Sequence, residues 1–248
     1  MHYKITGKEK PIILLHGFLE DHTIWQVVAE DLSKYFRVLA IDLPGHGKSP
    51  MIPKIHTMEM IAEEVCRVLQ TEKIEKATLV GHSLGGYVAL ACVEKHPGLF
   101  DGICLVNSTP EADSLERIEN RDRAIQAIWQ NKKRFIRMAI PNLFNQLKLE
   151  VYKLTIEKLV LAACKMSEES IIATIEGMKI RPNRLRTLKE FKGKKLWIIG
   201  QKDDILDAKQ LKKIAKRNEI PFVEFPDGHM SMIENSDEVT SVIKAFLS

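Results

Sequence analysis

The chain has 248 residues, of which 45% are hydrophobic and 28% charged, and its formal net charge is +4. This length fits one α/β domain with room for an insertion, and the composition is ordinary for a globular enzyme. Basic residues mostly alternate with acidic ones, so the sequence lacks the basic footprint of a nucleic-acid-binding protein. The densest basic stretch has the helical spacing of a solvated face: Lys132, Lys133, Arg134 and Arg137.

No sequence feature points to a metal, a disulfide framework or a membrane. The four cysteines do not have the clustered spacing of a disulfide framework or a zinc site, and they lie mostly in apolar runs: Cys66, Cys92, Cys104 and Cys164. No apolar run approaches the ~20 residues of a membrane helix, and the first residues have no leader pattern. We therefore expect a cytoplasmic protein with no membrane attachment.

Short, nearly all-apolar runs recur along the chain, as in strands buried on both faces of a sheet. They lie at 12–15, 37–41, 77–80, 102–106, 196–199 and 222–225. Helical periodicity occupies intervening and final stretches at about 23–34, 57–70, 84–96, 207–218 and 236–247. This alternation predicts a mostly parallel sheet with helices on both faces. The residues before Ile12 leave room for about one more strand.

The alternation is interrupted once, between the fourth and fifth of these strands. From Thr109 to Glu190 the apolar spacing is helical, and Pro141 and Pro182 punctuate it because proline ends or kinks a helix. We predict a core made of residues 1–108 and 191–248, with a helical segment at 109–190 inserted into it.

One serine occupies a turn that could make it a nucleophile. Gly81-His82-Ser83-Leu84-Gly85 fits the pattern Gly-x-Ser-x-Gly between the expected strand 77–80 and the following helix, which is the setting of a nucleophile elbow. On so sharp a turn the backbone is strained, and glycines let strand and helix approach closely. The hydroxyl then projects above the carboxyl edge of the sheet, where open α/β sheets bind ligands. The alternative is a glycine-rich turn without chemistry.

A serine hydroxyl reacts only when an oriented base accepts its proton. His229 is the best candidate, because it follows strand 222–225 and precedes the last helix. Asp203 and Asp204 follow strand 196–199 at the same sheet edge, and we prefer Asp203 as the acid that orients His229. Asp207 is expected to cap the next helix. Ser83, Asp203 and His229 follow one another along the chain in the order serine, acid, histidine. This is the order in which the three residues occur in proteins with this type of nucleophile elbow.

A tetrahedral intermediate also needs amide donors aimed at its oxygen. The backbone N–H of Leu84, directly after the serine, is one candidate. The second is the N–H of Phe18 in His16-Gly17-Phe18, which follows the first buried strand. His16 itself is as readily explained as a structural hydrogen-bonding residue.

Taken together, these segments resemble the α/β-hydrolase superfamily. The matching pieces are His16-Gly17-Phe18, the run 42–49, the run 81–86, Gly200-Gln201-Lys202-Asp203 and Gly228-His229. The resemblance implies a triad of Ser83, His229 and Asp203, an oxyanion hole of the Phe18 and Leu84 amides, and no cofactor. It also implies that 109–190 is a cap that covers the site and shapes the substrate pocket.

As an enzyme, the chain is expected to hydrolyse a small, largely apolar carboxylic ester or thioester through an acyl-Ser83 intermediate. Alternatives on the same fold are a C–C bond hydrolase, a lyase, a perhydrolase or a slow-turnover ligand receptor. Serine at the nucleophile position disfavours the dehalogenase and epoxide hydrolase branches, and Tyr87 and Val88 stand where the lyase branch typically has an arginine. Apolar candidates for the pocket are Phe18, Trp129, Phe135, Leu143, Phe144 and Met230.

Overall fold

The computed structural model describes residues 1–52 and 54–247, and within them one sheet of seven strands runs in the order β1-β3-β2-β4-β5-β6-β7. Strands β2 to β7 are parallel, and β1 pairs antiparallel with β3. All six predicted runs form strands, and β1 is the additional strand expected before Ile12. The bounds are β1 (Tyr3–Thr6), β2 (Pro11–Leu15), β3 (Arg37–Ile41), β4 (Ala77–His82), β5 (Phe100–Val106), β6 (Lys194–Gly200) and β7 (Phe222–Phe225).

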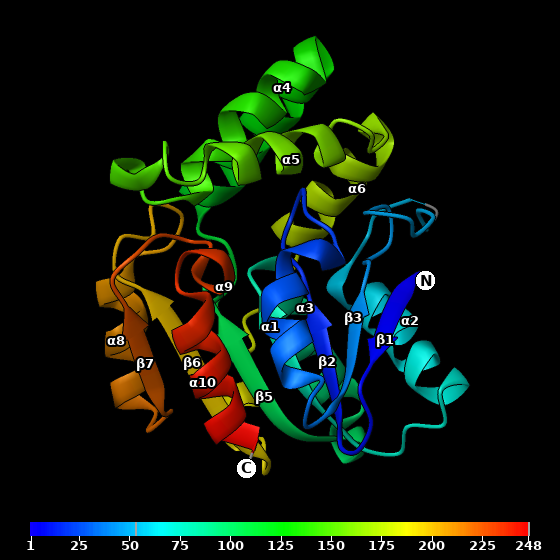
Figure 1. The fold of residues 1–248 in the computed structure, drawn as a ribbon. Helices are drawn as coiled ribbons and strands as arrows, with labels where there is room; N and C mark the ends of the chain where they lie inside the picture. Colours follow the sequence, from blue (N-terminus) through cyan, green and yellow to red (C-terminus); the bar gives the residue numbers. More distant parts are fainter. Residues whose placement is uncertain (53, 248) are drawn as a thin grey trace.

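Helices cover both faces of the sheet, as the alternation predicted (Figure 1). Helices α1 (Gln26–Leu32) and α10 (Ser236–Leu247) pack together on one face, and α2 (Met58–Thr71) and α3 (Leu84–Lys95) pack together on the other. Asp207 precedes helix α8 (Ala208–Arg217) as its N-cap, and its carboxylate accepts from the Lys209 and Gln210 amides, so the predicted cap is confirmed. None of the helices in the described residues has both the length and the apolar character needed to cross a membrane.

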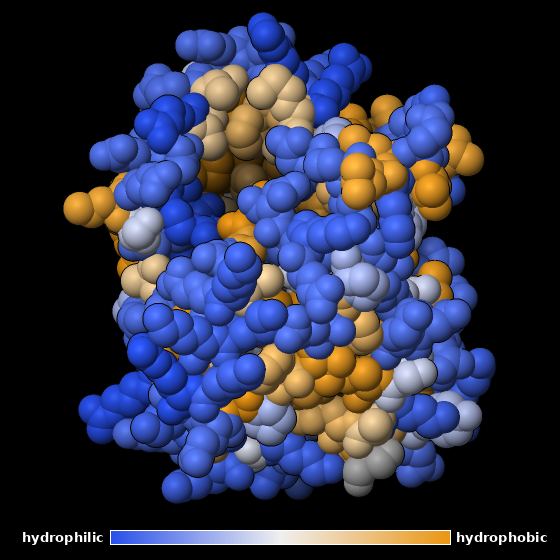
Figure 2. All heavy atoms as spheres, turned by 90° about the vertical axis from the view of Figure 1, so that its left-hand side faces the viewer, coloured by the Kyte–Doolittle hydropathy of each residue, from blue (hydrophilic) through white to orange (hydrophobic). Residues whose placement is uncertain are grey.

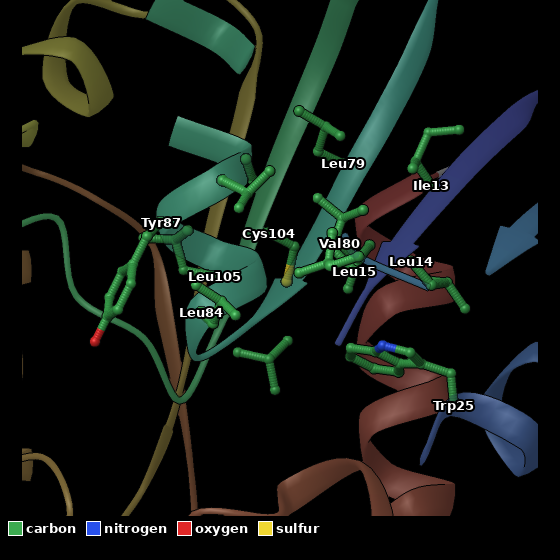
Figure 3. Close-up of a cluster of buried hydrophobic side chains, with 14 of the residues drawn as sticks. Ile13, Leu14, Leu15, Trp25, Leu79, Val80, Leu84, Tyr87, Cys104 and Leu105 are labelled. Atoms are coloured by element: carbon green, nitrogen blue, oxygen red, sulfur yellow. The ribbon is translucent and has the colours of Figure 1, made fainter. Parts of the chain in front are cut away.

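The core forms around the central strands, because their side chains are apolar on both faces. Residues 12–15 of β2 are fully buried, and Leu79, Val80, Cys104 and Leu105 continue the cluster from β4 and β5 (Figure 3). Trp25, at the end of the 3₁₀ turn η1 (His22–Trp25), closes it beside β2. Such packing fixes the carboxyl ends of neighbouring strands within one rigid edge.

The segment between β5 and β6 is helical, as expected. It contains α4 (Leu115–Ala139), η3 (Pro141–Leu143), η4 (Gln146–Lys148), α5 (Lys153–Ala163), α6 (Glu168–Lys179) and α7 (Leu185–Glu190). In Figure 1, α4, α5 and α6 lie above the carboxyl edge of the sheet, whereas α7 packs against α3 of the core. Helix α4 bends at Asn131, whose side chain accepts from the Arg134 amide and so begins the second half.

The elbow depends on a close approach between α3 and β2. A Cβ built on Gly85 would lie 2.3 Å from the Leu15 carbonyl oxygen, whereas one built on Gly98 would meet nothing within 4 Å. We expect Gly85→Ala to lower the free energy of unfolding by about 1–3 kcal/mol, the usual cost of overpacking, and Gly98→Ala to change it little. Urea denaturation of both variants measures the difference, and equal midpoints would contradict the close approach.

Candidate active site

Ser83 occupies the turn between β4 and α3 in a strained conformation. Its φ of 48° and ψ of −113° are rare for a residue with a side chain. The surrounding chain maintains this conformation: the Ser83 amide donates to the Val106 carbonyl at 3.0 Å, and the Ser83 carbonyl accepts from the Ser108 hydroxyl at 2.8 Å. Ser108 was not anticipated from the sequence, although it lies just past the end of a neighbouring strand.

His229 and Asp203 meet at the same edge. His229 Nδ1 lies 2.7 Å from Asp203 Oδ2, and both side chains are 2% exposed. The Asn107 amide nitrogen also donates to Oδ2 at 3.1 Å, and the amides of Ile205 and Leu206 donate to Oδ1. These contacts leave His229 Nε2 as the ring nitrogen able to face a substrate or a hydroxyl.

The electrostatics of Asp203 suit an acid that stays ionised. Burial on its own would raise the pKa of Asp203, but His229, the Asn107 amide and the Leu206 N–H together hold that pKa below its ordinary value. Asp204, the alternative from the sequence, instead lines the nearby pocket and is exposed. Asn107 was not predicted, since its partners are far away in sequence.

Ser83 and His229 line one pocket. Within the described chain, the structure contains no hydrogen bond from the Ser83 hydroxyl to His229. Such bonds are often long in free enzymes and shorten in the complex with substrate.

The two backbone amides that the sequence predicts as an oxyanion hole lie in the loop after β2 and directly after Ser83. In the described part of the chain, neither the Phe18 N–H nor the Leu84 N–H donates to a protein acceptor. Leu84 is the first residue of α3, where an amide has no partner inside its own helix. By contrast, His16 has the structural role that the sequence analysis allowed for it. Its Nε2 accepts from the Leu43 amide, and its Nδ1 donates to the Gly17 carbonyl.

The pocket has a volume of ≈ 480 Å³ and a mainly apolar wall. Figure 2 shows a hollow in the upper part of the molecule, with apolar side chains inside it and along its upper rim. The core supplies Phe18, Leu19 and Tyr87, and the inserted helices supply Ala124, Phe135, Met138, Ala139, Leu143, Ile175 and Met178. A larger hollow of ≈ 630 Å³ lies at the amino ends of β4, β5 and β6, opposite the edge where such sheets bind ligands.

Three of the predicted pocket residues lie elsewhere. Trp129 is 58% exposed on the outer side of α4, and Phe144 and Met230 are 1% and 0% exposed within the core. The prediction for them was wrong because an inserted helix carries apolar side chains on more than one face, and the sequence does not show which face meets the sheet. Phe135, Phe18 and Leu143 do line the pocket.

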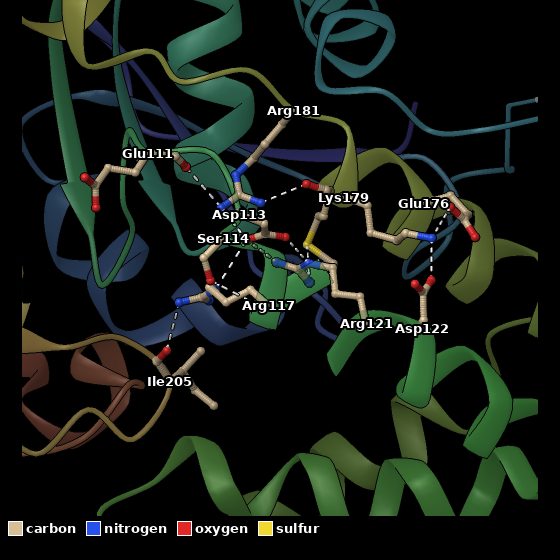
Figure 4. A network of polar contacts seen from close by, with 11 residues as sticks. Glu111, Asp113, Ser114, Arg117, Arg121, Asp122, Glu176, Lys179, Arg181 and Ile205 are labelled. Carbon is tan, nitrogen blue, oxygen red and sulfur yellow. Dashed lines mark hydrogen bonds and ion pairs between the residues drawn. The ribbon is translucent and has the colours of Figure 1, made fainter. Parts of the chain in front are cut away.

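Charged residues that the sequence did not single out also reach the pocket. Arg117 and Arg121 of α4 line its wall. Both guanidinium groups bind the buried Asp113, which also pairs with Arg181 at 2.8 Å (Figure 4). Arg181 in turn lies over the Tyr87 ring at 4.0 Å. The network ties α4 to the segment after α6, and it places two cations on a wall where only apolar residues were expected.

Glu20 is a further residue that the sequence left unremarked. Its carboxylate accepts from the Gly17 amide at 2.6 Å and lies 3.3 Å from His82 Nε2. The His82 ring lies 4.9 Å from the His229 ring, centre to centre. A glutamate in a buried loop is unusual, so Glu20 could have been noticed in the sequence. Its contacts with Gly17 and His82 could not have been predicted from the sequence.

His46 lies buried in the turn after β3. Burial lowers the pKa of His46 to about 3, below the ordinary value near 6.5. The unfolded chain therefore binds this proton more readily, and stability falls as the pH drops from about 6.5 towards 3.

We expect the free energy of unfolding to fall by about 1.4 kcal/mol per pH unit from this histidine. His46→Asn should show a correspondingly smaller loss between pH 7 and pH 5 in urea denaturation. Equal losses in the variant and the parent protein would contradict the assignment.

In the described residues, one cluster has the ligand types of a metal site: His2, His22 and Asp42. Nδ1 of each histidine contacts Asp42, at 2.8 and 2.7 Å, and the Lys48 amide also donates to this carboxylate. Hydrogen bonds therefore already satisfy Asp42. The cluster is separate from the pocket that holds Ser83.

The fold and this edge of the sheet define the class of protein. A family model described as the α/β hydrolase fold matches residues 10–155, more than half of the chain. The chain belongs to the α/β-hydrolase superfamily.

Individual relatives agree with this assignment. A thermophilic esterase from Thermogutta terrifontis, solved with malate bound, superposes with a TM-score of 0.92 at 32% identity, over 99% of this chain and 92% of that one. The enol-lactonase of Burkholderia xenovorans LB400 gives 0.91 at 25% identity, over 99% and 95%. A putative carbamate hydrolase, RutD of Yersinia enterocolitica, is 33% identical over 47% of this chain. That match spans 44% of RutD, less than half of its length.

Proposed function

We propose that this protein is a serine hydrolase that cleaves carboxylic esters or thioesters through an acyl-Ser83 intermediate. The observation that carries the proposal is the 2.7 Å contact between His229 and Asp203 beside a pocket lined by Ser83. The esterase and enol-lactonase relatives support this reaction type.

In the first half of the proposed reaction, His229 Nε2 takes the proton of the Ser83 hydroxyl as its oxygen attacks the substrate carbonyl carbon. The carbonyl π electrons move onto oxygen, and the Phe18 and Leu84 amides stabilise the resulting oxyanion. When the tetrahedral intermediate collapses, the bond to the alcohol or thiol breaks, and that group leaves with the proton from His229. Asp203 stays ionised and holds the ring in orientation.

In the second half, water enters beside the acyl-Ser83 ester. His229 takes a proton from this water, the hydroxide oxygen attacks the acyl carbon, and the second tetrahedral intermediate uses the same amides. The proton then returns to the Ser83 oxygen as the carboxylic acid is released. Each half of the reaction therefore ends with His229 neutral.

We propose that the inserted helices α4, α5 and α6 act as a cap, and that α7 belongs structurally with the core. The cap supplies much of the apolar pocket wall, which favours a small, largely apolar acyl group. The pocket's volume of ≈ 480 Å³ lies in the lower part of the range for small-molecule sites.

The alternative functions on this fold predict different results with simple esters. A C–C bond hydrolase or lyase would act faster on its carbon–carbon substrate than on simple esters, a perhydrolase would transfer the acyl group to hydrogen peroxide in preference to water, and a ligand receptor would be labelled once without turnover. The intact Asp203–His229 contact gives no support to an inactive relative.

A substrate screen tests the proposal. Purified protein is assayed on p-nitrophenyl esters of increasing acyl length and on the matching acyl-CoA thioesters. We expect multiple turnovers on short acyl chains in at least one series, with the thiol release assay deciding between ester and thioester. Failure of every ester and thioester to turn over would overturn the proposed function.

A further inference from the structure

The pocket wall formed by α4 holds more positive than negative charge. Three guanidinium groups, those of Arg117, Arg121 and Arg181, converge on the single carboxylate of Asp113, whose side chain is 0% exposed (Figure 4). Burial on its own would raise the pKa of Asp113, but Arg181 and Arg121 hold that pKa below its ordinary value, so the carboxylate is ionised. The network therefore has three cations for one anion.

The two arginines of α4 keep donors for a further partner. Nη1 of Arg117 donates to the Ile205 carbonyl at 3.3 Å, and its Nε lies 3.3 Å from Asp113. In the described chain Nη2 of Arg117 has no acceptor, and this side chain is 33% exposed. Nη1 of Arg121 donates to the sulfur of Met178 at 3.5 Å, and a thioether is a weak acceptor. Both guanidinium groups can therefore still donate to an oxygen in the pocket.

The acidic side chains that line the same pocket do not neutralise these arginines. Among the described residues, neither Glu20 nor Asp204 forms an ion pair with them. The Glu20 carboxylate is 2% exposed and accepts from the Gly17 amide, and Asp204 is exposed to water. Partly dehydrated cations without a counter-ion raise the free energy of the protein. This part of the wall therefore favours a ligand that brings a negative charge.

The bend of α4 at Asn131 divides its side of the pocket into a polar and an apolar part. Before the bend the lining residues include Arg117, Asn120 and Arg121, and after it they are Phe135, Met138 and Ala139. The polar part adjoins the loop that holds Asp203, because Arg117 donates to the Ile205 carbonyl and the Ile205 amide donates to Asp203 Oδ1. A ligand that fills both parts has an apolar body and one anionic end.

We propose that Arg117 and Arg121 select esters or thioesters that carry a carboxylate away from the bond that is cleaved. This inference rests on the proposed function and names the substrate class of the same pocket. A carboxylate suits the site, because its two oxygens accept charge-assisted hydrogen bonds from guanidinium N–H groups. The charge can belong to the acyl part or to the alcohol part of the substrate, and the two are distinguished by the probes below.

The test compares each charged ester with the neutral carboxamide of the same shape. The acyl part is probed with the mono-p-nitrophenyl esters of adipate and suberate and their terminal carboxamides, and the alcohol part with 4-acetoxybenzoate and 4-acetoxybenzamide. Each kcat/KM is divided by the rate constant for spontaneous hydrolysis of the same ester. We expect the parent protein to prefer the charged ester by about 10- to 100-fold in one of the two series, mainly through KM. High salt should reduce this preference, because both arginines are partly exposed.

Substitution of the arginines connects the preference to the network. Arg117→Gln and Arg121→Gln should each lower the charged-to-neutral ratio of kcat/KM by about tenfold. Arg117→Lys should keep part of the preference, since lysine retains the charge but not the fork of donors. Arg137→Gln is the matched control, because Arg137 is exposed on the same helix and does not line the pocket. Its ratio should equal that of the parent protein.

Thermal unfolding identifies any variant that fails to fold, in which case the parent ratio and its salt dependence test the same claim. Equal values for charged and neutral esters in every series would overturn the selection of a carboxylate. A preference that persists in both folded glutamine variants, or that falls equally in Arg137→Gln, would overturn the role of these two arginines. Absence of any ester or thioester hydrolysis by the parent protein would instead overturn the proposed function.

Discussion

Ser83→Ala is expected to lower kcat/KM on a short-chain p-nitrophenyl ester by about 10⁴- to 10⁶-fold, the usual loss when a triad nucleophile is removed. The hydroxyl is the only part of the side chain that is deleted, and the turn is restrained through the Ser83 backbone by Val106 and Ser108. The variant should therefore fold normally. Steady-state kinetics beside a thermal unfolding curve measure both properties.

The matched control is Ser241→Ala on α10, where the hydroxyl is exposed and donates to the Asp237 carbonyl. It should keep the parent activity. If Ser83→Ala retained more than a few per cent of the activity in a folded protein, catalysis would have to proceed without an acyl-serine.

Asp203→Asn is the second substitution with a large expected effect, about 10⁴-fold in kcat. An asparagine preserves the shape, but it can present an N–H to His229 Nδ1, which then favours the wrong tautomer. It also removes the negative charge that stabilises the imidazolium. Activity should not be recovered at higher pH, because the missing charge cannot be restored by titration.

Asp204→Asn distinguishes the two adjacent carboxylates. Asp204 lines the pocket, whereas the contact with His229 comes from Asp203. We expect Asp204→Asn to alter KM modestly and to leave kcat within about tenfold of the parent value. A large loss of kcat in Asp204→Asn together with a small one in Asp203→Asn would reverse the assignment.

The sheet was predictable because its strands are buried on both faces and therefore read as short apolar runs. Residues 12–15 and 77–80 are examples, and all six runs appear as strands. The inserted helices were predictable only as helices. Trp129 and Phe135 have similar apolar character in the sequence, yet the first faces outward and the second lines the pocket.

The candidate site divides in the same way. Ser83, Asp203 and His229 could be proposed because each follows its own strand, and parallel strands bring their carboxyl ends to one edge. Asn107, Glu20 and Arg121 could not, because their significance comes from partners distant in the sequence. Long-range polar contacts of this kind have no periodicity for a sequence to display.

The central claim is that Ser83 forms a covalent bond to the substrate, and a fluorophosphonate probe tests it most directly. The protein is treated with the probe at neutral pH, digested, and mapped by peptide mass spectrometry. We predict one adduct, on the peptide that carries Ser83, and its absence both in Ser83→Ala and after heat unfolding. An adduct on another serine, or labelling that persists in Ser83→Ala, would contradict the account.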